Sequence, residues 1–225
     1  MIYQKNSSKQ RPVKHNILLL VAAFFIFWTP VIIFSKIAGE VIEKEPIGID
    51  YTILHAIHDQ ATPLLDQAFI FITNLGSAET IIIVTLLIFA YLLYKRQRQN
   101  ALILFASVSG AAVANLILKA LFHRIRPSLW NLVITETGYS FPSGHAMLSS
   151  ALILSIIFII WKTRWRWPGL VAGVLLIGLI GLSRLYLGVH YPTDIIAGWS
   201  VSILWLLIVL VITKNLSIKL HNKKL

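Results

Sequence analysis

The sequence contains no cysteine, and this absence excludes a disulfide framework, a thiolate metal site and a catalytic thiol. Charged residues are also scarce, at 13% of the chain, whereas a soluble domain has roughly 25%. Only nine residues are acidic. Apolar residues make up 57% of the 225 positions, so the composition is that of a membrane protein, and the length allows one domain or two.

Long apolar stretches make up most of the sequence. A helix rises about 1.5 Å per residue and the hydrocarbon core of a bilayer is about 30 Å thick, so a span needs roughly 20 apolar residues. Six stretches come close to this length: 17–34, 79–94, 100–121, 144–161, 167–185 and 193–213. A signal peptide has a shorter apolar core, so the first stretch is interpreted as a retained span. We therefore predict an all-α fold, a six-span transmembrane helical bundle, with residues 1–225 forming a single integral-membrane domain.

Residues 36–78 differ from the rest because most of the acidic residues fall there. Two pairs of apolar residues, Ile49 with Ile53 and Leu54 with Ile57, recur at helical spacing. This pattern predicts an amphipathic helix that lies on the membrane surface between the first and second spans. The sequence assigns this segment no chemical role.

The distribution of charge explains the net charge of +11. If both termini lie inside, the inner segments hold fourteen of the 20 Lys and Arg residues, and all nine Asp and Glu residues fall outside or at outer helix ends. The positive-inside rule then places both termini in the cytoplasm. The basic excess would face anionic lipid headgroups, so we expect no nucleic-acid partner.

Three polar clusters fall at outer helix ends in this topology. Polar groups at such positions are costly in a membrane protein and are seldom present without a function. Taken singly, the two cations of the first cluster could simply snorkel to the interface. The clusters are Lys119 with Arg126-Pro127, then Pro142-Ser143-Gly144-His145, then Ser183-Arg184 with His190 and Asp194. If the outer ends of these spans meet, all three clusters contribute to one site.

The clusters have the composition of a phosphate site. Lys119, Arg126 and Arg184 are cations, and arginine offers a rigid fork of donors that suits phosphate oxygens. Ser143 and Gly144 begin a helix, whose free N–H groups and dipole favour an anion.

The same clusters contain the groups needed for phosphoryl transfer. Neutral His190 could attack phosphorus while Asp194 holds the proton on its other ring nitrogen. Protonated His145 could give its proton to the leaving oxygen. The cations would offset charge in the transition state, and no cluster has the several carboxylates that suit magnesium, so we expect neither a metal nor another cofactor. Glu136 is an acid between the first two clusters, and the sequence gives it no role.

The spacings Lys-x6-Arg-Pro, Pro-Ser-Gly-His and Ser-Arg-x5-His-x3-Asp resemble the motifs of the type 2 phosphatidic acid phosphatase (PAP2) superfamily. All three match without departure between Lys119 and Asp194. The resemblance implies that His190 becomes a phosphohistidine, with Asp194 as its partner and His145 as general acid. It implies that the phosphate is held by Lys119, Arg126, Ser143, Gly144 and Arg184. It also implies a metal-independent lipid phosphatase with its site at the outer membrane–water boundary.

Several functions remain compatible with this site. The leading hypothesis is hydrolysis of a terminal lipid phosphate on the outer face, with undecaprenyl diphosphate ranked first. Phosphatidylglycerophosphate or phosphatidic acid, with broad specificity, ranks close behind. A phosphotransferase could use the same site, and an anion transporter is the alternative from another class. The small size is similar to bacterial members of the family, which suggests the bacterial cytoplasmic membrane. The sequence sets no oligomeric state.

Overall fold

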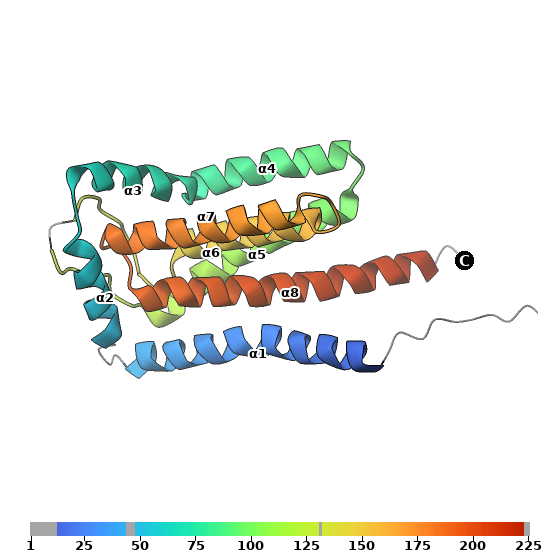
Figure 1. Ribbon diagram of the computed structural model, residues 1–225, viewed down its shortest axis with the longest axis horizontal. Coiled ribbons are helices and arrows are strands. Elements are labelled where there is room, and N and C mark those ends of the chain that lie inside the picture. Colours follow the sequence, from blue (N-terminus) through green and yellow to red (C-terminus); the bar gives the residue numbers. More distant parts are fainter. Residues whose placement is uncertain (1–12, 44–47, 131, 223–225) are drawn as a thin grey trace, which may run out of the picture.

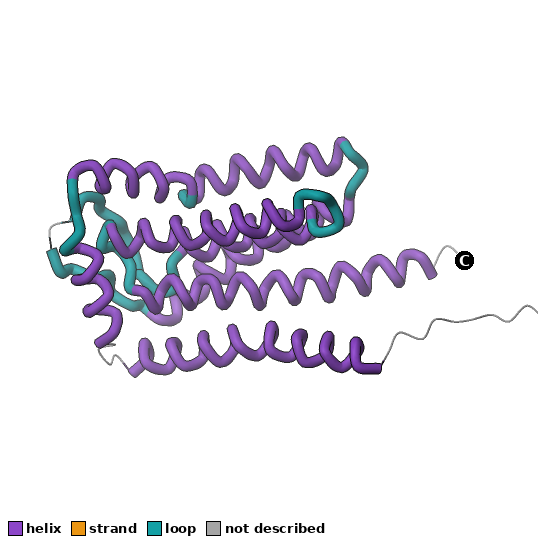
Figure 2. The backbone as a smooth tube through the Cα atoms, viewed as in Figure 1, coloured by secondary structure: helices purple, strands orange, loops and turns teal. Residues whose placement is uncertain are grey.

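The computed structural model describes residues 13–43, 48–130 and 132–222, and these residues form eight helices and no strand. Figure 1 shows the long helices running side by side, and Figure 2 shows that the described connections are loops. The all-α prediction is therefore confirmed for the described residues. The helices are α1 (Val13–Glu43), α2 (Gly48–His58), α3 (Pro63–Leu75), α4 (Ala78–Tyr94), α5 (Arg98–Phe122), α6 (Gly144–Ile160), α7 (Arg166–Tyr186) and α8 (Pro192–Asn222).

Each predicted apolar stretch coincides with one helix, within one or two residues for the four middle stretches. The first and last helices are longer than predicted, and α1 continues nine residues beyond the predicted end at Phe34. The continuation forms because Ile37 and Val41 are buried one turn apart against Phe141 and Ala197. The packing of this face keeps the helix intact although its sequence is no longer uniformly apolar.

Four helices are by themselves long and apolar enough to cross a bilayer: Val21–Glu43 of α1, α5, α7 and Pro192–Asn215 of α8. Helices α3 and α4 meet at a bend of 44° and together make a fifth candidate. Helix α6 is apolar but has only 17 residues. The described part of the chain is thus an integral membrane bundle with four or five candidate spans.

The segment predicted as a surface helix is divided among the end of α1, α2 and α3. Helix α2 crosses one end of the bundle, where it packs against α7 and α8 (Figure 1). Its fully buried residues are Asp50 and Leu54, whereas Ile49 is 63% exposed. The buried stripe of α2 therefore contains a carboxylate.

Helix α6 lies at the centre of the bundle and packs against α5, α7 and α8. Small residues allow this close approach, as expected for helices in lipid. A methyl group at Gly198 of α8 would lie 3.1 Å from the carbonyl oxygen of Ser143. The Ser202 hydroxyl of α8 also donates to the carbonyl oxygen of Met147, at 2.7 Å. These contacts hold the N-terminal ends of α6 and α8 together.

Large apolar side chains cover the outer faces of the long helices. The exposed ones include Phe24, Phe25, Leu87, Leu116, Val171 and Leu175. Such a surface would aggregate in water, but it suits contact with lipid tails. The buried charged side chains Asp50, Arg184, His190 and Asp194 instead lie at the end of the bundle next to α2.

Candidate active site

The three polar clusters meet at the end of the bundle where α5 and α7 finish and α6 and α8 begin (Figure 1). The loops that follow α5 and α7 bring in the rest. The residues lie as follows: Lys119 in the last turn of α5, Arg126 in the next loop, Ser143 as N-cap of α6 followed by Gly144 and His145, Arg184 in the last turn of α7, His190 before α8, and Asp194 in the first turn of α8. One site therefore receives groups from four helices.

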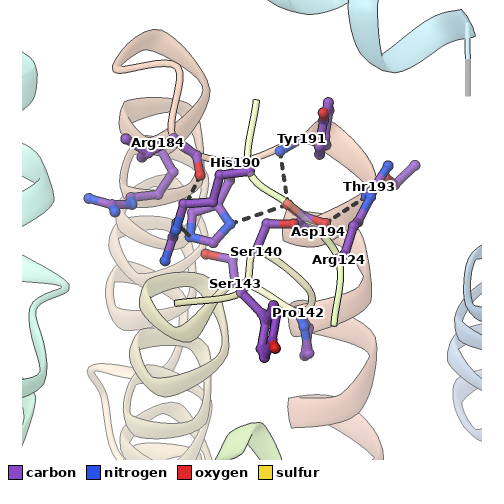
Figure 3. A network of polar contacts seen from close by, with 12 residues as sticks. Arg124, Ser140, Pro142, Ser143, Arg184, His190, Tyr191, Thr193 and Asp194 are labelled. Atoms are coloured by element: carbon purple, nitrogen blue, oxygen red, sulfur yellow. Dashed lines mark hydrogen bonds and ion pairs between the residues drawn. The ribbon is translucent and has the colours of Figure 1, made fainter. Parts of the chain in front are cut away.

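His190 and Asp194 form a pair. The Nδ1 atom of His190 lies 3.2 Å from Oδ2 of Asp194, and Nε2 lies 3.0 Å from Nη1 of Arg126 (Figure 3). Because arginine can only donate, Nε2 must be the acceptor and Nδ1 must carry the proton. Asp194 thus selects the tautomer whose free lone pair is on Nε2, the atom that would attack phosphorus.

The chain between α7 and α8 sets this geometry. Gly188 has a φ of +70°, in the left-handed region that favours glycine. Pro192 then starts α8 with a φ suited to a first helical position. The backbone N–H of Tyr191 donates to Oδ2 of Asp194 at 3.0 Å, so the carboxylate also caps the start of α8. The turn and the helix start together fix the pair.

His190 is 1% exposed, and its surroundings are positive. Burial lowers the pKa of His190 well below its ordinary value, and the charges of Arg184, Arg126 and Lys119 lower it further. The imidazole is therefore neutral at neutral pH, as a nucleophile requires. Of the three predicted cations, Arg126 contacts the ring directly, and the charges of Arg184 and Lys119 also act on it.

Arg126 is held by backbone carbonyl groups. Its Nη1 donates to Val189 at 2.8 Å, its Nε to Gly138 at 3.1 Å and its Nη2 to Thr137 at 3.2 Å. The chain reaches this position because His123, with a left-handed φ of 48°, ends α5 and redirects the loop. The guanidinium is thus fixed beside Nε2 of His190.

Arg184 is 1% exposed and pairs with Glu136. Its Nη1 donates to the Thr73 hydroxyl at 2.6 Å, while its buried Nε has no hydrogen-bond partner among the described residues. Glu136 also lies 3.7 Å from Arg126. Burial would raise the pKa of Glu136, but the charge and hydrogen bond of Arg184 hold it below its usual value. An ionised carboxylate therefore lies between two of the predicted phosphate-binding arginines.

The start of α6 contributes the second cluster. Ser143 caps the helix, since its hydroxyl accepts from the N–H of Ala146 at 3.4 Å, and its own N–H donates to the carbonyl of Asp194 at 3.1 Å. The His145 side chain, by contrast, has no hydrogen bond within the described part of the chain. Lys119 donates to the carbonyl of Tyr139 in the loop before α6. The helix start faces the pair, and the His145 ring is available to a ligand.

Sequence reasoning missed three residues behind the pair. Arg124 donates to Oδ1 of Asp194 at 2.6 Å (Figure 3). Asp50 of α2 binds both Arg124 and Thr193. A signal for Asp50 was present, because it precedes the buried Leu54 by four residues and so shares its face of α2. The position of Arg124, two residues before a motif arginine, gave no comparable signal.

The donor set suits an anion more than a metal ion. In residues 13–43, 48–130 and 132–222, no group of three or more His, Asp or Glu side chains is arranged to share a metal. Three cations and a helix N-terminus instead face a neutral imidazole. This arrangement can bind a phosphoryl group and present a nucleophile to it.

Several proteins of known name are similar to this chain in sequence. The family model described as the PAP2 superfamily matches residues 100–218. Phosphatidylglycerophosphatase B of Bacillus subtilis is 30% identical over 148 residues, covering 63% of this chain and 72% of that protein. Undecaprenyl-diphosphatase of Sulfolobus acidocaldarius is 29% identical over 172 residues, covering 74% and 78%.

The fold has solved counterparts. The crystal structure of a transmembrane PAP2-type phosphatidylglycerolphosphate phosphatase from Bacillus subtilis superposes with a TM-score of 0.77 at 23% identity, covering 85% of this chain and 97% of that one. The structure of LpxE from Aquifex aeolicus gives a TM-score of 0.61 at 24% identity, covering 72% and 94%. At these identities the likeness concerns the fold alone. The family match over residues 100–218, together with the named phosphatases, shows that this chain belongs to the PAP2 superfamily and is a lipid phosphatase.

Proposed function

We propose that this enzyme removes a terminal phosphate from a membrane lipid, without a metal ion, through a phosphohistidine at His190. The observation that carries the proposal is the pairing of the two ring nitrogens, Nδ1 with Asp194 and Nε2 toward Arg126. This pairing leaves a lone pair on Nε2 in a positive environment. An anionic phosphoryl group would be drawn to the same place.

The first step transfers the phosphoryl group to the enzyme. Nε2 of His190 forms a bond to phosphorus while the bond from phosphorus to the lipid-side oxygen breaks. Protonated His145 gives its proton to that oxygen. The arriving phosphate takes Nη1 of Arg126 as a donor to one of its oxygens, which releases Nε2 for attack. Lys119, Arg184, the Ser143 hydroxyl and the N–H of Gly144 offset the charge on the remaining oxygens.

The second step hydrolyses the phosphohistidine. Water attacks phosphorus, His145 accepts a proton from that water, and the P–N bond breaks with its electron pair returning to Nε2. Inorganic phosphate leaves and neutral His190 is restored. The unpartnered Nε of Arg184 supports this scheme, because a buried donor without a partner is costly unless a ligand supplies the acceptor.

The first substrate we propose is undecaprenyl diphosphate. Relatives named undecaprenyl-diphosphatase include the Sulfolobus acidocaldarius protein and BcrC of Bacillus subtilis, which is 29% identical over 164 residues. The second candidate is phosphatidylglycerophosphate or phosphatidic acid, supported by the Bacillus subtilis phosphatidylglycerophosphatase B. A lipid phosphotransferase is the third, because a phosphohistidine can pass its phosphate to an acceptor other than water.

The test is phosphate release in detergent micelles that contain EDTA, from undecaprenyl diphosphate, phosphatidylglycerophosphate, phosphatidic acid and a water-soluble phosphate ester. We expect the wild-type chain to release phosphate most rapidly from undecaprenyl diphosphate, and His190→Ala to lose at least about a thousandfold in kcat. The loss follows from removal of the atom that bonds to phosphorus.

Two results would contradict the proposed mechanism, and two others would change the substrate or the acceptor. Turnover that survives in His190→Ala would exclude the phosphohistidine, and release that EDTA abolishes would exclude metal independence. Preference for phosphatidylglycerophosphate would select the second candidate substrate. Label that moves from a radioactive lipid phosphate to a glycolipid, rather than to inorganic phosphate, would select the phosphotransferase. His221→Ala, at the C-terminal end of α8, is the control for loss of a histidine elsewhere.

A further inference from the structure

Asp50 is a buried carboxylate far from the motifs in sequence. It lies on α2, has no exposed surface, and accepts three kinds of donor. Arg124 donates to its Oδ2 at 2.8 Å, the Thr193 hydroxyl donates to Oδ2 at 2.6 Å, and the Thr193 N–H donates to Oδ1 at 3.0 Å. A buried charge is retained only when it is paired and hydrogen-bonded, and Asp50 meets both conditions. Its partners all lie next to Asp194.

Arg124 connects the two carboxylates. Its Nη2 binds Asp50 and its Nη1 binds Oδ1 of Asp194 at 2.6 Å, while its guanidinium lies 4.1 Å from the centre of the Tyr191 ring. Burial would lower the pKa of Arg124, but the charge of Asp194 and the hydrogen bond of Asp50 raise it. The guanidinium is therefore a permanent cation held between two anions and one aromatic face.

Asp194 depends on this cation. The carboxylate has no exposed surface, and its two oxygens face different groups. Oδ2 serves the His190 ring and the Tyr191 N–H, and Oδ1 serves Arg124 (Figure 3). An ionised carboxylate that loses its counter-charge in a buried site is strongly destabilised. Without Arg124, Asp194 would lose both its charge partner and the contact that sets its rotation toward His190.

We propose that Arg124 and Asp50 are positioning residues for the catalytic pair, forming a chain Asp50–Arg124–Asp194–His190 that runs from α2 to the nucleophile. The inference rests on the proposed phosphohistidine function. It gives α2 a role in catalysis, because α2 supplies the carboxylate that holds Arg124 in place. Neither residue contacts the side of His190 where the phosphate would bind.

The kinetic signature follows from this geometry. The Nε2 side of His190 carries the phosphate contacts, so loss of Asp50 or Arg124 lowers kcat and leaves KM nearly unchanged. Because Asp50 acts through Arg124, its removal has little further effect once Arg124 is gone. If Asp50 were purely structural and only fastened α2 to α8 through Thr193, its removal would lower kcat by the same factor with or without Arg124.

The experiment measures kcat and KM for the preferred lipid phosphate with four variants of the full-length chain in detergent. We expect Asp50→Asn to lower kcat about tenfold and Arg124→Gln about a hundredfold. Arg124→Lys keeps the charge and should recover part of that loss. In the double variant Asp50→Asn/Arg124→Gln, kcat should equal that of Arg124→Gln within about twofold. Thermal unfolding and gel filtration check that each variant is folded.

Asp66→Asn is the matched control. Asp66 also joins an outlying helix to the bundle, since it accepts from the Tyr186 hydroxyl at 2.7 Å, but it does not contact the pair. We expect its kcat to stay within about twofold of wild type.

Two outcomes would overturn the inference. One is an unchanged kcat in folded Asp50→Asn and Arg124→Gln. The other is an effect of Asp50→Asn that is as large in the Arg124→Gln background as in the wild type. Activity that survives in His190→Ala would instead reject the proposed function itself, so the two failures can be told apart.

Discussion

At the scale of single residues, Glu136 partly offsets the charge of the two arginines near His190. This carboxylate pairs with Arg184 and lies 3.7 Å from Arg126, so it occupies donors that a phosphate would need. The sequence gave Glu136 no role, because nothing in its position indicates that the loop folds back over the arginines. In the structure it is an internal anion placed on the arginines that a substrate phosphate would need.

We therefore predict that Glu136→Gln lowers KM for the lipid phosphate about fivefold, equivalent to about 1 kcal/mol for a partly exposed ion pair, with kcat unchanged. Since the pKa of Glu136 is held below its usual value, the carboxylate stays ionised through neutral and mildly acidic pH. The difference in KM should persist over that range and shrink only when pH falls through this lowered pKa. Steady-state kinetics between about pH 5 and 8 would measure it.

Because glutamine has nearly the same shape as glutamate, Glu136→Gln removes only the charge. Glu43→Gln, at the end of α1, is the control for loss of a carboxylate elsewhere. If Glu136→Gln lowered kcat and left KM unchanged, Glu136 would be needed to orient Arg184, and competition with the phosphate would be rejected.

At the scale of helices, the site depends on how close the first turns of α6 and α8 lie to each other. The Ser143 N–H binds the Asp194 carbonyl at 3.1 Å, and Gly198 faces the first turn of α6 without a side chain. A methyl group there would lie 3.1 Å from the Ser143 carbonyl oxygen and 3.3 Å from the Met147 nitrogen, both backbone atoms. Backbone atoms of two packed helices cannot move independently, so such a group would push the helix starts apart.

We predict that Gly198→Ala lowers the unfolding free energy by about 1–3 kcal/mol through overpacking, although alanine favours helix formation. It should also lower kcat, because the helix starts carry Ser143 and Asp194. Gly178→Ala is the matched control, since a methyl group at Gly178 meets nothing within 4 Å. Thermal unfolding in detergent measures the stability of the two variants. Equal unfolding midpoints for Gly198→Ala and Gly178→Ala would show that a methyl group fits between α8 and α6 at Gly198.

At the scale of the whole molecule, the two ends of the bundle differ in charge. The α4–α5 and α6–α7 turns carry Lys95, Arg96 and Lys162 at the end of the bundle opposite the site. The N-terminal end of α1 and the C-terminal end of α8 lie at this same end (Figure 1). We propose on this basis that all six apolar stretches cross the bilayer, with α3 and α4 as one bent span. Both termini would then be cytoplasmic and the active site would face outward.

The absence of native cysteine allows a direct test of this orientation. We predict that Asp59→Cys, in the exposed turn after α2, reacts with a membrane-impermeant maleimide on intact spheroplasts. Lys162→Cys, in the exposed turn after α6, should react only after the membrane is permeabilised. The parent chain is the unlabelled control. If only Lys162→Cys were labelled on intact spheroplasts, the topology would be the reverse of the one proposed. If both variants were labelled there, the proposed number of spans would be rejected.

The sequence by itself determined the helical class, the approximate position of each long helix and the residues of the three motifs. These properties are local or pairwise: an apolar stretch of sufficient length must be helical in lipid, and the motif spacings place Lys119, Ser143 and Arg184 at helix ends. The family assignment followed from the same spacings and agrees with the match over residues 100–218.

Only the tertiary structure decided which side chains stand behind those motifs. Arg124 and Glu136 have no periodicity or spacing that marks them, and the helical spacing of Asp50 with Leu54 indicates its face of α2 but not its partners. Each acquires its role from contacts at least 48 residues away. The extension of α1 to Glu43 likewise depends on packing against Phe141 and Ala197. Buried charge can be balanced only by groups that the fold brings within a few ångströms, so the partners of a catalytic pair are determined by the fold even where the pair itself is evident from the sequence.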